Sequence, residues 1–289
     1  EVVRPILRVV LRQALGVART HLLAGSPTQG GVRAPAATPD PGDLGVVEEE
    51  PEGPGEVEPQ EPTVYGAVSV PGGWDNDTFV PFDYGYFAFV YDKNKLKNPP
   101  KSLKELVEGE QKWRVIYEDP RTSTPGLGLL LWMQKVYGDK APEAWQKLAA
   151  KTVTVTKGWS EAYGLFLKGE SDLVLSYTTS PAYHIIEEKK DNYAAANFAE
   201  GHYLQVEVAA RTAASKQPEL AEKFLKFMVS PGFQNAIPTG NWMYPVTTVA
   251  LPAGFDALMK PQTTLEFTPQ QVAAERQNWI SAWQRAVSR

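Results

Sequence analysis

From residue 64 to the C-terminus, the sequence predicts an α/β fold built on a largely parallel sheet. Short apolar runs typical of buried strands alternate with segments of helical periodicity, which is the pattern of a parallel sheet covered by helices. All 8 tryptophans, 12 tyrosines and 11 phenylalanines lie beyond Val64, so the side chains that build a large core are confined to this region. The sequence has no internal repeat.

The individual elements follow from the same periodicities. Strands are expected at residues 84–91, 114–117, 153–155, 173–177 and 203–210. Helices are expected at residues 126–137, 141–150, 160–168, 218–228 and 269–287. Two capping boxes mark helix starts: Ser102 with Glu105 opens a short helix, and Thr268 with Gln271 opens the last one.

The first 63 residues differ in composition from the rest. Residues 1–24 place Arg4, Arg8 and Arg12 on one helical face beside apolar residues, which fits either a basic amphipathic helix at a membrane surface or a weakly helical tail. Arginines interrupt every apolar run, so this segment is a poor secretory signal. Residues 25–63 contain eight prolines, seven glycines, nine acids and no aromatic residue. This composition predicts disorder, because too little apolar area is available to offset the entropy lost on folding.

Composition excludes several classes of function. Lys and Arg number 29 against 34 Asp and Glu, with a net charge of −5, which argues against a basic nucleic-acid-binding protein. The chain has no cysteine, so thiolate catalysis, disulfides and Cys-ligated metals are excluded. The three histidines do not have H-E-x-x-H spacing, and metal chemistry is poorly supported. His184 is not next to a serine in a G-x-S-x-G motif, and we expect no catalysis.

The strongest local signal for a ligand is residues 119–126, at a strand-to-helix junction. Thr124 is expected as the N-cap and Pro125 as the first helical residue. Backbone N–H groups and the positive end of a helix dipole, flanked by the Thr122 and Ser123 hydroxyls, form a site suited to a phosphate. Ordinary capping without a ligand is the alternative.

A second strand-to-helix junction repeats this design at residues 176–183. Its polar and aromatic residues are Tyr177, Thr178, Thr179, Ser180 and Tyr183. In open α/β sheets, ligands bind beyond the carboxyl ends of the strands. Two such turns indicate a polar site for a small molecule, although each taken alone is also a good helix cap.

Two tryptophans stand at turns where they can meet a ligand. Trp159 follows the predicted strand at 153–155, where an indole can stack on a flat or cationic group, a contact worth about 0.5–2 kcal/mol. Trp242 follows a Pro-Thr-Gly turn. For both, burial in the core is the alternative.

Four stretches of the sequence resemble the thiamine-binding periplasmic proteins, the solute-binding components of thiamine ABC transporters. They are residues 70–100, 113–139, 152–184 (ending LSYTTSPAYH) and 237–245 (IPTGNWMYP). The resemblance runs from about residue 67 to the C-terminus and implies a two-lobed periplasmic binding protein of type II topology. It implies that thiamine or its mono- or diphosphate is cargo rather than a cofactor, so that no cofactor is expected.

The resemblance also implies roles for individual residues. Ser123 and Thr124 match a phosphate-contacting pair, and Trp159 matches a ligand-contacting tryptophan. A contiguous binding run is matched by Tyr177, Thr178, Thr179 and Ser180. Tyr183 and Trp242 match aromatics expected to flank the heterocycles. The implied partners are a membrane permease and its ATPase, and the implied location is the periplasm.

The resemblance does not extend to residues 1–63, which we expect to be an unrelated segment in place of the first strands of lobe one. The expected divisions are 64–91 with 204–267 for the rest of lobe one, 92–203 for lobe two, and 268–289 for a C-terminal helix. Ligand affinity is then expected to be weaker than in a complete family member. One alternative is a non-functional hybrid whose N-terminal helix adheres to membranes. Another is an enzyme like thiaminase I, which resembles the same two-lobed fold, but its cysteine nucleophile is absent here.

Overall fold

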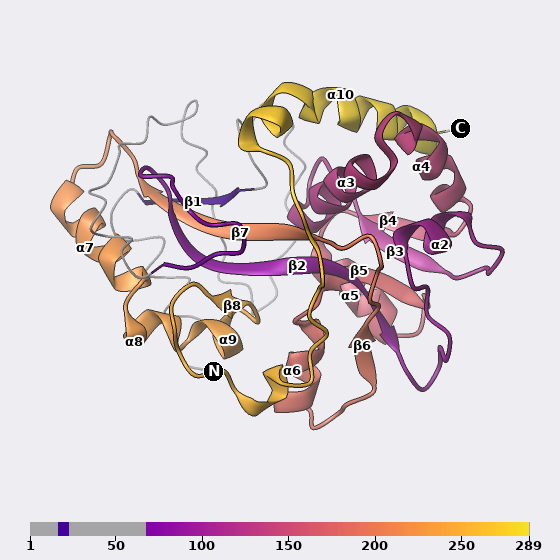
Figure 1. Cartoon of the computed structure of the whole chain (residues 1–289), viewed down its shortest axis with the longest axis horizontal. Helices are drawn as coiled ribbons and strands as arrows, with labels where there is room; N and C mark the ends of the chain where they lie inside the picture. Colours follow the sequence, from indigo (N-terminus) through magenta and orange to yellow (C-terminus); the bar gives the residue numbers. More distant parts are fainter. Residues whose placement is uncertain (1–16, 23–67, 289) are drawn as a thin grey trace, which may run out of the picture.

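A computed structural model describes residues 17–22 and 68–288 of the chain. Their strands join in one nine-stranded sheet, whose main path runs β1-β7-β2-β5-β3-β4 (Figure 1). The strands are β1 (Val17–Leu22), β2 (Val80–Asp92), β3 (Val115–Glu118), β4 (Thr152–Thr156), β5 (Leu173–Tyr177), β6 (Tyr193–Ala195), β7 (His202–Arg211), β8 (Tyr244–Pro245) and β9 (Thr264–Leu265).

Helices follow most of these strands, as the sequence predicts. They are α2 (Leu103–Glu108), α3 (Thr124–Tyr137), α4 (Ala141–Ala149), α5 (Trp159–Leu167), α6 (Ser180–Glu187), α7 (Pro218–Met228), α8 (Pro231–Gln234), α9 (Ile237–Gly240) and α10 (Pro269–Val287), with short 3₁₀ turns η2 (Gly138–Lys140) and η3 (Ala253–Phe255). The expected α7 and α10 have the same bounds in the structure.

The sheet is mixed rather than largely parallel. Strand β3 is parallel to β4 and β5, as expected for strands joined by crossover helices. The long strand β2 is antiparallel to both β5 and β7. Alternation along the sequence detects the crossovers, but it does not give the direction of a strand that pairs with elements far along the chain.

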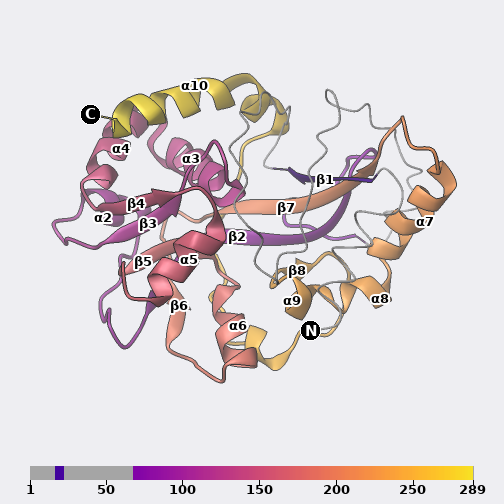
Figure 2. The ribbon, with the colours of Figure 1, turned by 180° about the vertical axis from the view of Figure 1, so that it is seen from behind.

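Strands β2 and β7 connect two halves of the molecule (Figures 1 and 2). Pairing of β2 with β7 extends to Tyr86, and pairing with β5 begins at Phe87. We call the half with α2 to α6, β3 to β6 and α10 lobe two, and the half with β1, β8 and α7 to α9 lobe one. The predicted divisions near residues 92 and 203 stay a prediction.

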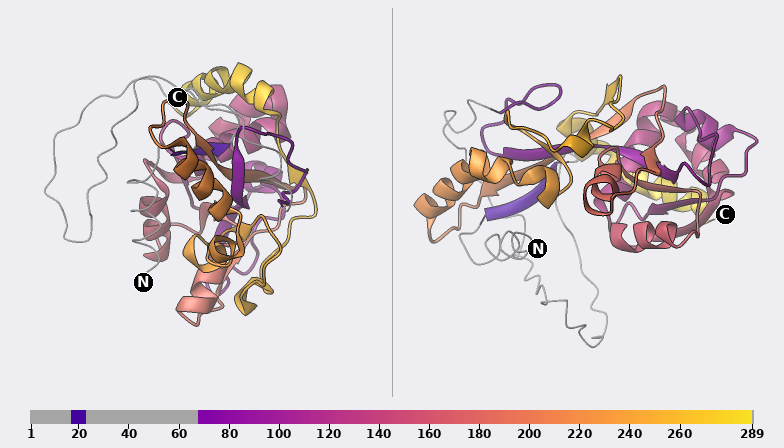
Figure 3. Two further views of the ribbon diagram at one scale, coloured as in Figure 1. Left: turned by 90° about the vertical axis from the view of Figure 1, so that its left-hand side faces the viewer. Right: turned by 90° about the horizontal axis from the view of Figure 1, so that it is seen from below.

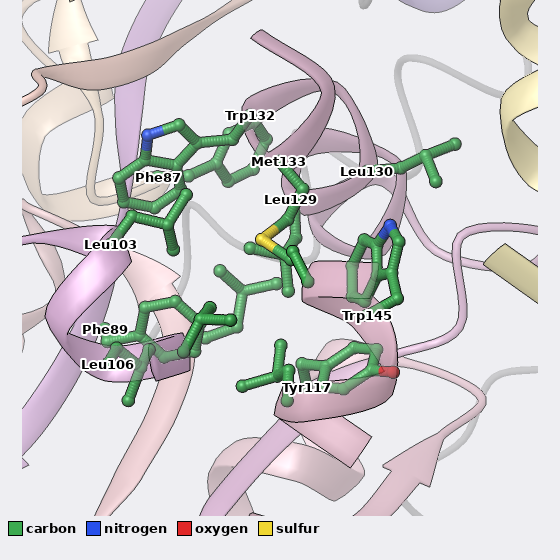
Figure 4. Packing of buried hydrophobic residues seen from close by; sticks show 14 of the residues in the cluster. Phe87, Phe89, Leu103, Leu106, Tyr117, Leu129, Leu130, Trp132, Met133 and Trp145 are labelled. Carbon is green, nitrogen blue, oxygen red and sulfur yellow. The ribbon is translucent and has the colours of Figure 1, made fainter. Parts of the chain in front are cut away.

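In lobe two, side chains alternate between the two faces of the sheet. On one face, Phe87 and Phe89 of β2, Tyr117 of β3 and Leu175 of β5 pack against α2, α3, α4 and α10 (Figure 4). Ten large residues of this cluster are labelled in the figure: Phe87, Phe89, Leu103, Leu106, Tyr117, Leu129, Leu130, Trp132, Met133 and Trp145. Burial on both faces explains the nearly continuous apolar sequence of these strands.

The opposite face of the same strands packs on α5. Val90, Ile116 and Val174 contact Ala162 and Phe166 there. In lobe one, α7 lies at one end of the sheet (Figure 3). Its Leu225 and Met228 pack against Val80 and Ala209. Among the residues that the structure describes, no helix is long and apolar enough to cross a membrane.

The two predicted capping boxes differ in outcome. At α10, the Thr268 hydroxyl accepts from the Gln271 N–H and the Gln271 side chain accepts from the Thr268 N–H, so the box is confirmed. At α2, Ser102 accepts from the Glu105 N–H at 2.9 Å, but the Glu105 carboxylate accepts from Lys101 instead of Ser102. Only half of that box forms, because the carboxylate reaches one residue further back.

The N-terminal segment contributes a strand. Residues 17–22, predicted as part of a helix or helical tail, form β1 and pair antiparallel with β7, from Val17 opposite Arg211 to Leu22 opposite Val206. The local sequence pattern of residues 17–22 does not show that the edge of β7 is available. Pairing with that edge decides their local structure. The rest of the predicted helix and the segment 25–63 lie outside the described residues.

Candidate functional site

The carboxyl ends of β3, β4 and β5 meet at one edge of the sheet because these strands are parallel. Glu118 of β3 lies opposite Thr156 of β4, and the Asp119 N–H donates to the Thr156 carbonyl at 2.8 Å. The Thr122 hydroxyl donates to the Lys157 carbonyl at 2.7 Å, which joins the loop after β3 to the loop after β4. The predicted junctions are therefore neighbours in space.

Helix α3 starts one residue earlier than the sequence predicts. Ser123, in an extended conformation, is the N-cap, Thr124 is the first helical residue and Pro125 the second. The Ser123 side chain makes no capping hydrogen bond to the first turn. Ser123 and Thr124 are both partly exposed at the positive end of the helix dipole, and contact of their hydroxyls with a ligand stays a prediction.

The loop before α3 carries a compact ion pair. Arg121 Nη2 lies 2.6 Å from Asp119 Oδ2, and the Arg121 N–H also donates to this carboxylate. Burial raises the pKa of Asp119, but the hydrogen bonds from Arg121 outweigh burial and hold that pKa below its ordinary value. Asp119 is thus an ionised carboxylate whose charge is paired with Arg121, and this pairing stiffens the turn.

Glu118 is an unusual buried acid at the end of β3. It has no exposed surface, and neither carboxylate oxygen has a hydrogen-bond partner among the described residues. Burial raises the pKa of Glu118 well above its ordinary value. The side chain lies two residues beyond Ile116, on the face that α5 covers, so burial beneath the strand ends favours the protonated form of this carboxyl.

Trp159 is the first residue of α5 and is not a core residue. Its side chain is 39% exposed. The indole Nε1–H donates to the Ser176 hydroxyl at 2.8 Å, and the ring stacks on Tyr163 at a centroid distance of 5.0 Å and an interplanar angle of 22°. One edge and one face of the indole are thereby fixed, and the remaining exposed surface can meet a ligand.

The run that follows β5 is more buried than the sequence indicates. The Tyr177 hydroxyl donates to Gln205 Oε1 at 2.9 Å, and the Thr179 hydroxyl donates to the Trp242 carbonyl at 2.6 Å. Thr178 and Thr179 have no exposed surface, and the Thr178 hydroxyl has no hydrogen-bond partner among the described residues. Their direct contact with a ligand stays a prediction.

Tyr183 and Trp242 bring α6 of lobe two against the loop after α9. Their rings meet edge to face, with centroids 5.3 Å apart and an interplanar angle of 88°. Trp242 has a φ of 57°, a left-handed conformation that few non-glycine residues adopt. The hydrogen bond from Thr179 to the Trp242 carbonyl helps to hold this conformation.

Two groups of polar residues near these strand ends were missed at the sequence level. Asn241 donates to Asp83 at 2.6 Å and to Glu207 at 3.4 Å, and Gln205, which accepts from Tyr177, donates to Glu207. These residues come from β2, β7 and the loop after α9, so only the fold unites them. Ser176 begins the predicted junction 176–183, but it was not singled out as a candidate ligand residue.

His184 is a buried structural residue. Its Nε2 bonds to the Tyr163 hydroxyl at 2.8 Å and its Nδ1 to Glu188 at 2.8 Å. The hydrogen bond with His184 holds the pKa of Glu188 below its ordinary value. Among the residues that the structure describes, no group of three or more His, Asp or Glu side chains is placed to hold a metal ion.

Comparison with known proteins identifies the family. The model of the family described as "Bacterial extracellular solute-binding protein" matches residues 60–261. Proteins named thiamine-binding periplasmic protein from Salmonella typhimurium and Escherichia coli are 91% and 88% identical over 223 residues, 77% of this chain and 68% of theirs. A protein of the same name from Brucella suis is 59% identical over 224 residues, 77% of this chain and 67% of its own.

Solved structures agree on the fold. A periplasmic thiamin binding protein matches with a TM-score of 0.78 and 83% identity, over 81% of this chain and 74% of that chain. The ferric binding protein from Campylobacter jejuni matches with a TM-score of 0.67 and 16% identity, over 80% of this chain and 77% of that one, and this likeness shows the fold alone. The predicted two-lobed α/β fold is confirmed. The chain belongs to the family of bacterial extracellular solute-binding proteins, among the thiamine-binding periplasmic proteins.

Proposed function

We propose that this chain binds thiamine or a thiamine phosphate in the periplasm and delivers it to an ABC importer. Relatives at 91% and 88% identity are named as thiamine-binding periplasmic proteins. Those names describe binding proteins rather than enzymes, and the comparisons support neither the thiaminase-like alternative nor the hybrid one. A membrane permease and its ATPase are the partners that such a role requires.

The observation that carries this proposal is the indole of Trp159 beside the start of α3. One edge and one face of the ring are held by the protein, and the other face is exposed. Thiamine joins a cationic thiazolium ring to a pyrimidine ring, and its phosphates are anions. An exposed indole face attracts the cation and stacks on flat rings. The Thr122–Lys157 hydrogen bond holds the Ser123–Thr124 turn next to the loop that bears Trp159. This proximity supports a cation site and an anion site at the same sheet edge.

We further propose that Tyr183 and Trp242 enclose the heterocycles and that the run Tyr177, Thr178, Thr179 and Ser180 completes the site. The edge-to-face contact of Tyr183 and Trp242 supports this, since it places two aromatic groups from different lobes side by side. The buried hydroxyls of Thr178 and Thr179 are better suited to shape the site than to reach a ligand, because neither residue has exposed surface.

Isothermal titration calorimetry with thiamine tests the role of Trp159. Trp159→Ala is expected to raise the Kd for thiamine roughly 2- to 30-fold, since a cation–π contact contributes about 0.5–2 kcal/mol. Phe227→Ala is the control, because it removes an aromatic side chain of comparable exposure (49%) from α7 in lobe one. Wild-type protein that takes up no thiamine would refute the proposed function. Equal affinity in wild type and Trp159→Ala would remove Trp159 from the site.

The phosphate part of the proposal predicts a ligand-dependent effect of Ser123→Ala. The variant should bind thiamine monophosphate about 5- to 30-fold more weakly than wild type, because a hydrogen bond to a charged group contributes about 1–2 kcal/mol. Affinity for unphosphorylated thiamine should be unchanged. The two ligands are compared by the same calorimetry, and an equal loss for both would show that Ser123 does not contact the phosphate.

A further inference from the structure

The Ser176 hydroxyl bonds to two predicted ligand residues, Trp159 and Ser180, and through Ser180 it is linked to a third, Tyr177. Ser176 itself is not a predicted ligand residue. It lies in β5, two residues beyond Val174, on the face covered by α5, and it has no exposed surface. Its hydroxyl accepts from Trp159 Nε1 at 2.8 Å and lies 2.6 Å from the Ser180 hydroxyl. The Ser180 hydroxyl in turn accepts from the Tyr177 N–H at 3.2 Å.

The donors and acceptors of this chain fix the direction of its hydrogen bonds. An indole N–H only donates, whereas a hydroxyl donates one hydrogen and accepts up to two. If the Ser180 hydroxyl donated to Ser176, the hydroxyl hydrogen of Ser176 would have no acceptor among the described residues. Leaving a buried donor without an acceptor costs about 1–3 kcal/mol. The favoured order is therefore Trp159 to Ser176 to Ser180. Ser180 then accepts from Ser176 and Tyr177, and because Ser180 is partly exposed, its own hydrogen is free to be donated to water or to a ligand.

The Trp159 indole is held at a second point. Tyr163 stacks on one face, and its hydroxyl is bonded to the buried His184, which fixes the stacking ring. Ser176 holds the edge of the indole and Tyr163 holds one face. The orientation of the other face, the one available to a ligand, is set by these two contacts.

We infer that Ser176 is a positioning residue of the proposed thiamine site. It orients the indole of Trp159 and makes the Ser180 hydroxyl a donor toward an acceptor oxygen of the ligand, without touching the ligand itself. This inference rests on the proposed function and deepens it. It assigns the partly exposed Ser180, at the first position of α6, as the ligand contact of the pair.

Ser176→Ala tests the inference by binding and by spectroscopy. The variant should bind thiamine about 5- to 30-fold more weakly, because one or both of the two oriented groups lose a net hydrogen bond. Its tryptophan emission should shift to longer wavelength as the Trp159 edge takes a water partner. The same substitution in a Trp159→Phe background, which lacks the indole N–H, should produce no such shift. Ser176→Thr keeps the hydroxyl and should restore both emission and binding.

A double-mutant cycle of Ser176→Ala and Trp159→Phe completes the test. The two losses in affinity should combine to less than their sum, because both changes remove the same hydrogen bond. Additive losses, or unchanged emission in Ser176→Ala, would overturn the positioning role. The spectral arm needs no ligand, so a wild-type protein that fails to bind thiamine would refute the proposed function while leaving the Trp159 anchor measurable.

Discussion

Gly126→Ala is expected to destabilise the protein by about 3 kcal/mol and to abolish tight binding of a phosphorylated ligand. A Cβ at this position would clash with the Glu118 carbonyl oxygen and would lie 2.6 Å from the carbonyl group of Asp119. These are backbone atoms, which cannot rotate away, and overpacking of this kind costs about 1–3 kcal/mol or more. The first turn of α3 would have to move off the end of β3 and carry Ser123 and Thr124 with it.

Gly164→Ala is the matched control for this substitution. Gly164 lies inside α5, and a Cβ there meets no atom within 4 Å. Alanine should therefore stabilise the protein by about 0.5–1 kcal/mol, because glycine is the poorer helix residue. Urea unfolding gives the two free energies, and calorimetry with thiamine monophosphate gives the affinities. If Gly126→Ala were as stable and bound as tightly as Gly164→Ala, the close approach of α3 to β3 would have no functional role.

Glu118→Gln is expected to gain stability relative to wild type as the pH rises. Burial raises the folded-state pKa of Glu118 above its unfolded value. At low pH the carboxyl is protonated in both states and contributes nothing. Above the unfolded pKa only the unfolded state ionises, so wild type loses about 1.4 kcal/mol per pH unit until the folded-state pKa is reached. Glutamine does not titrate and avoids this loss.

The measurement is the free energy of unfolding in urea for wild type and Glu118→Gln from pH 4 to pH 8. The difference between the two proteins should widen steadily above about pH 4.5, the ordinary value for a glutamate. Glu143→Gln, at an exposed position in the first turn of α4, controls for the loss of one acid. Parallel curves for wild type and Glu118→Gln would show that this carboxyl finds a partner in solution.

Much of the architecture was predictable because it depends on local signals. The strand 173–177 and the helix 218–228 have the expected bounds, since apolar runs and amphipathic periodicity report burial directly. The proximity of the loops after β3, β4 and β5 was predictable too, because parallel strands place their carboxyl ends at one edge. The resemblance to a known family supplied the choice of ligand, which no periodicity contains.

The contacts that depend on register or on backbone conformation were not predictable. The hydrogen bond between Trp159 and Ser176 joins residues 17 positions apart and requires β5 to end beside α5. The sequence does not signal the left-handed conformation of Trp242, because the residue at this position is not a glycine. The strand at residues 17–22 depends on the free edge of β7, which lies nearly 190 residues away in the sequence.

The shared strands β2 and β7 have a mechanical consequence. Because β2 and β7 are hydrogen-bonded to each other from Val80 to Tyr86 and β2 then continues into lobe two beside β5, the lobes are not joined by a loop about which they can swing freely. Movement of one lobe relative to the other must bend a two-stranded ribbon of β2 and β7, whose hydrogen bonds oppose the bending. We therefore expect small changes in the angle between the lobes that reverse by themselves. Once the ligand has been released, the protein should return to its starting conformation.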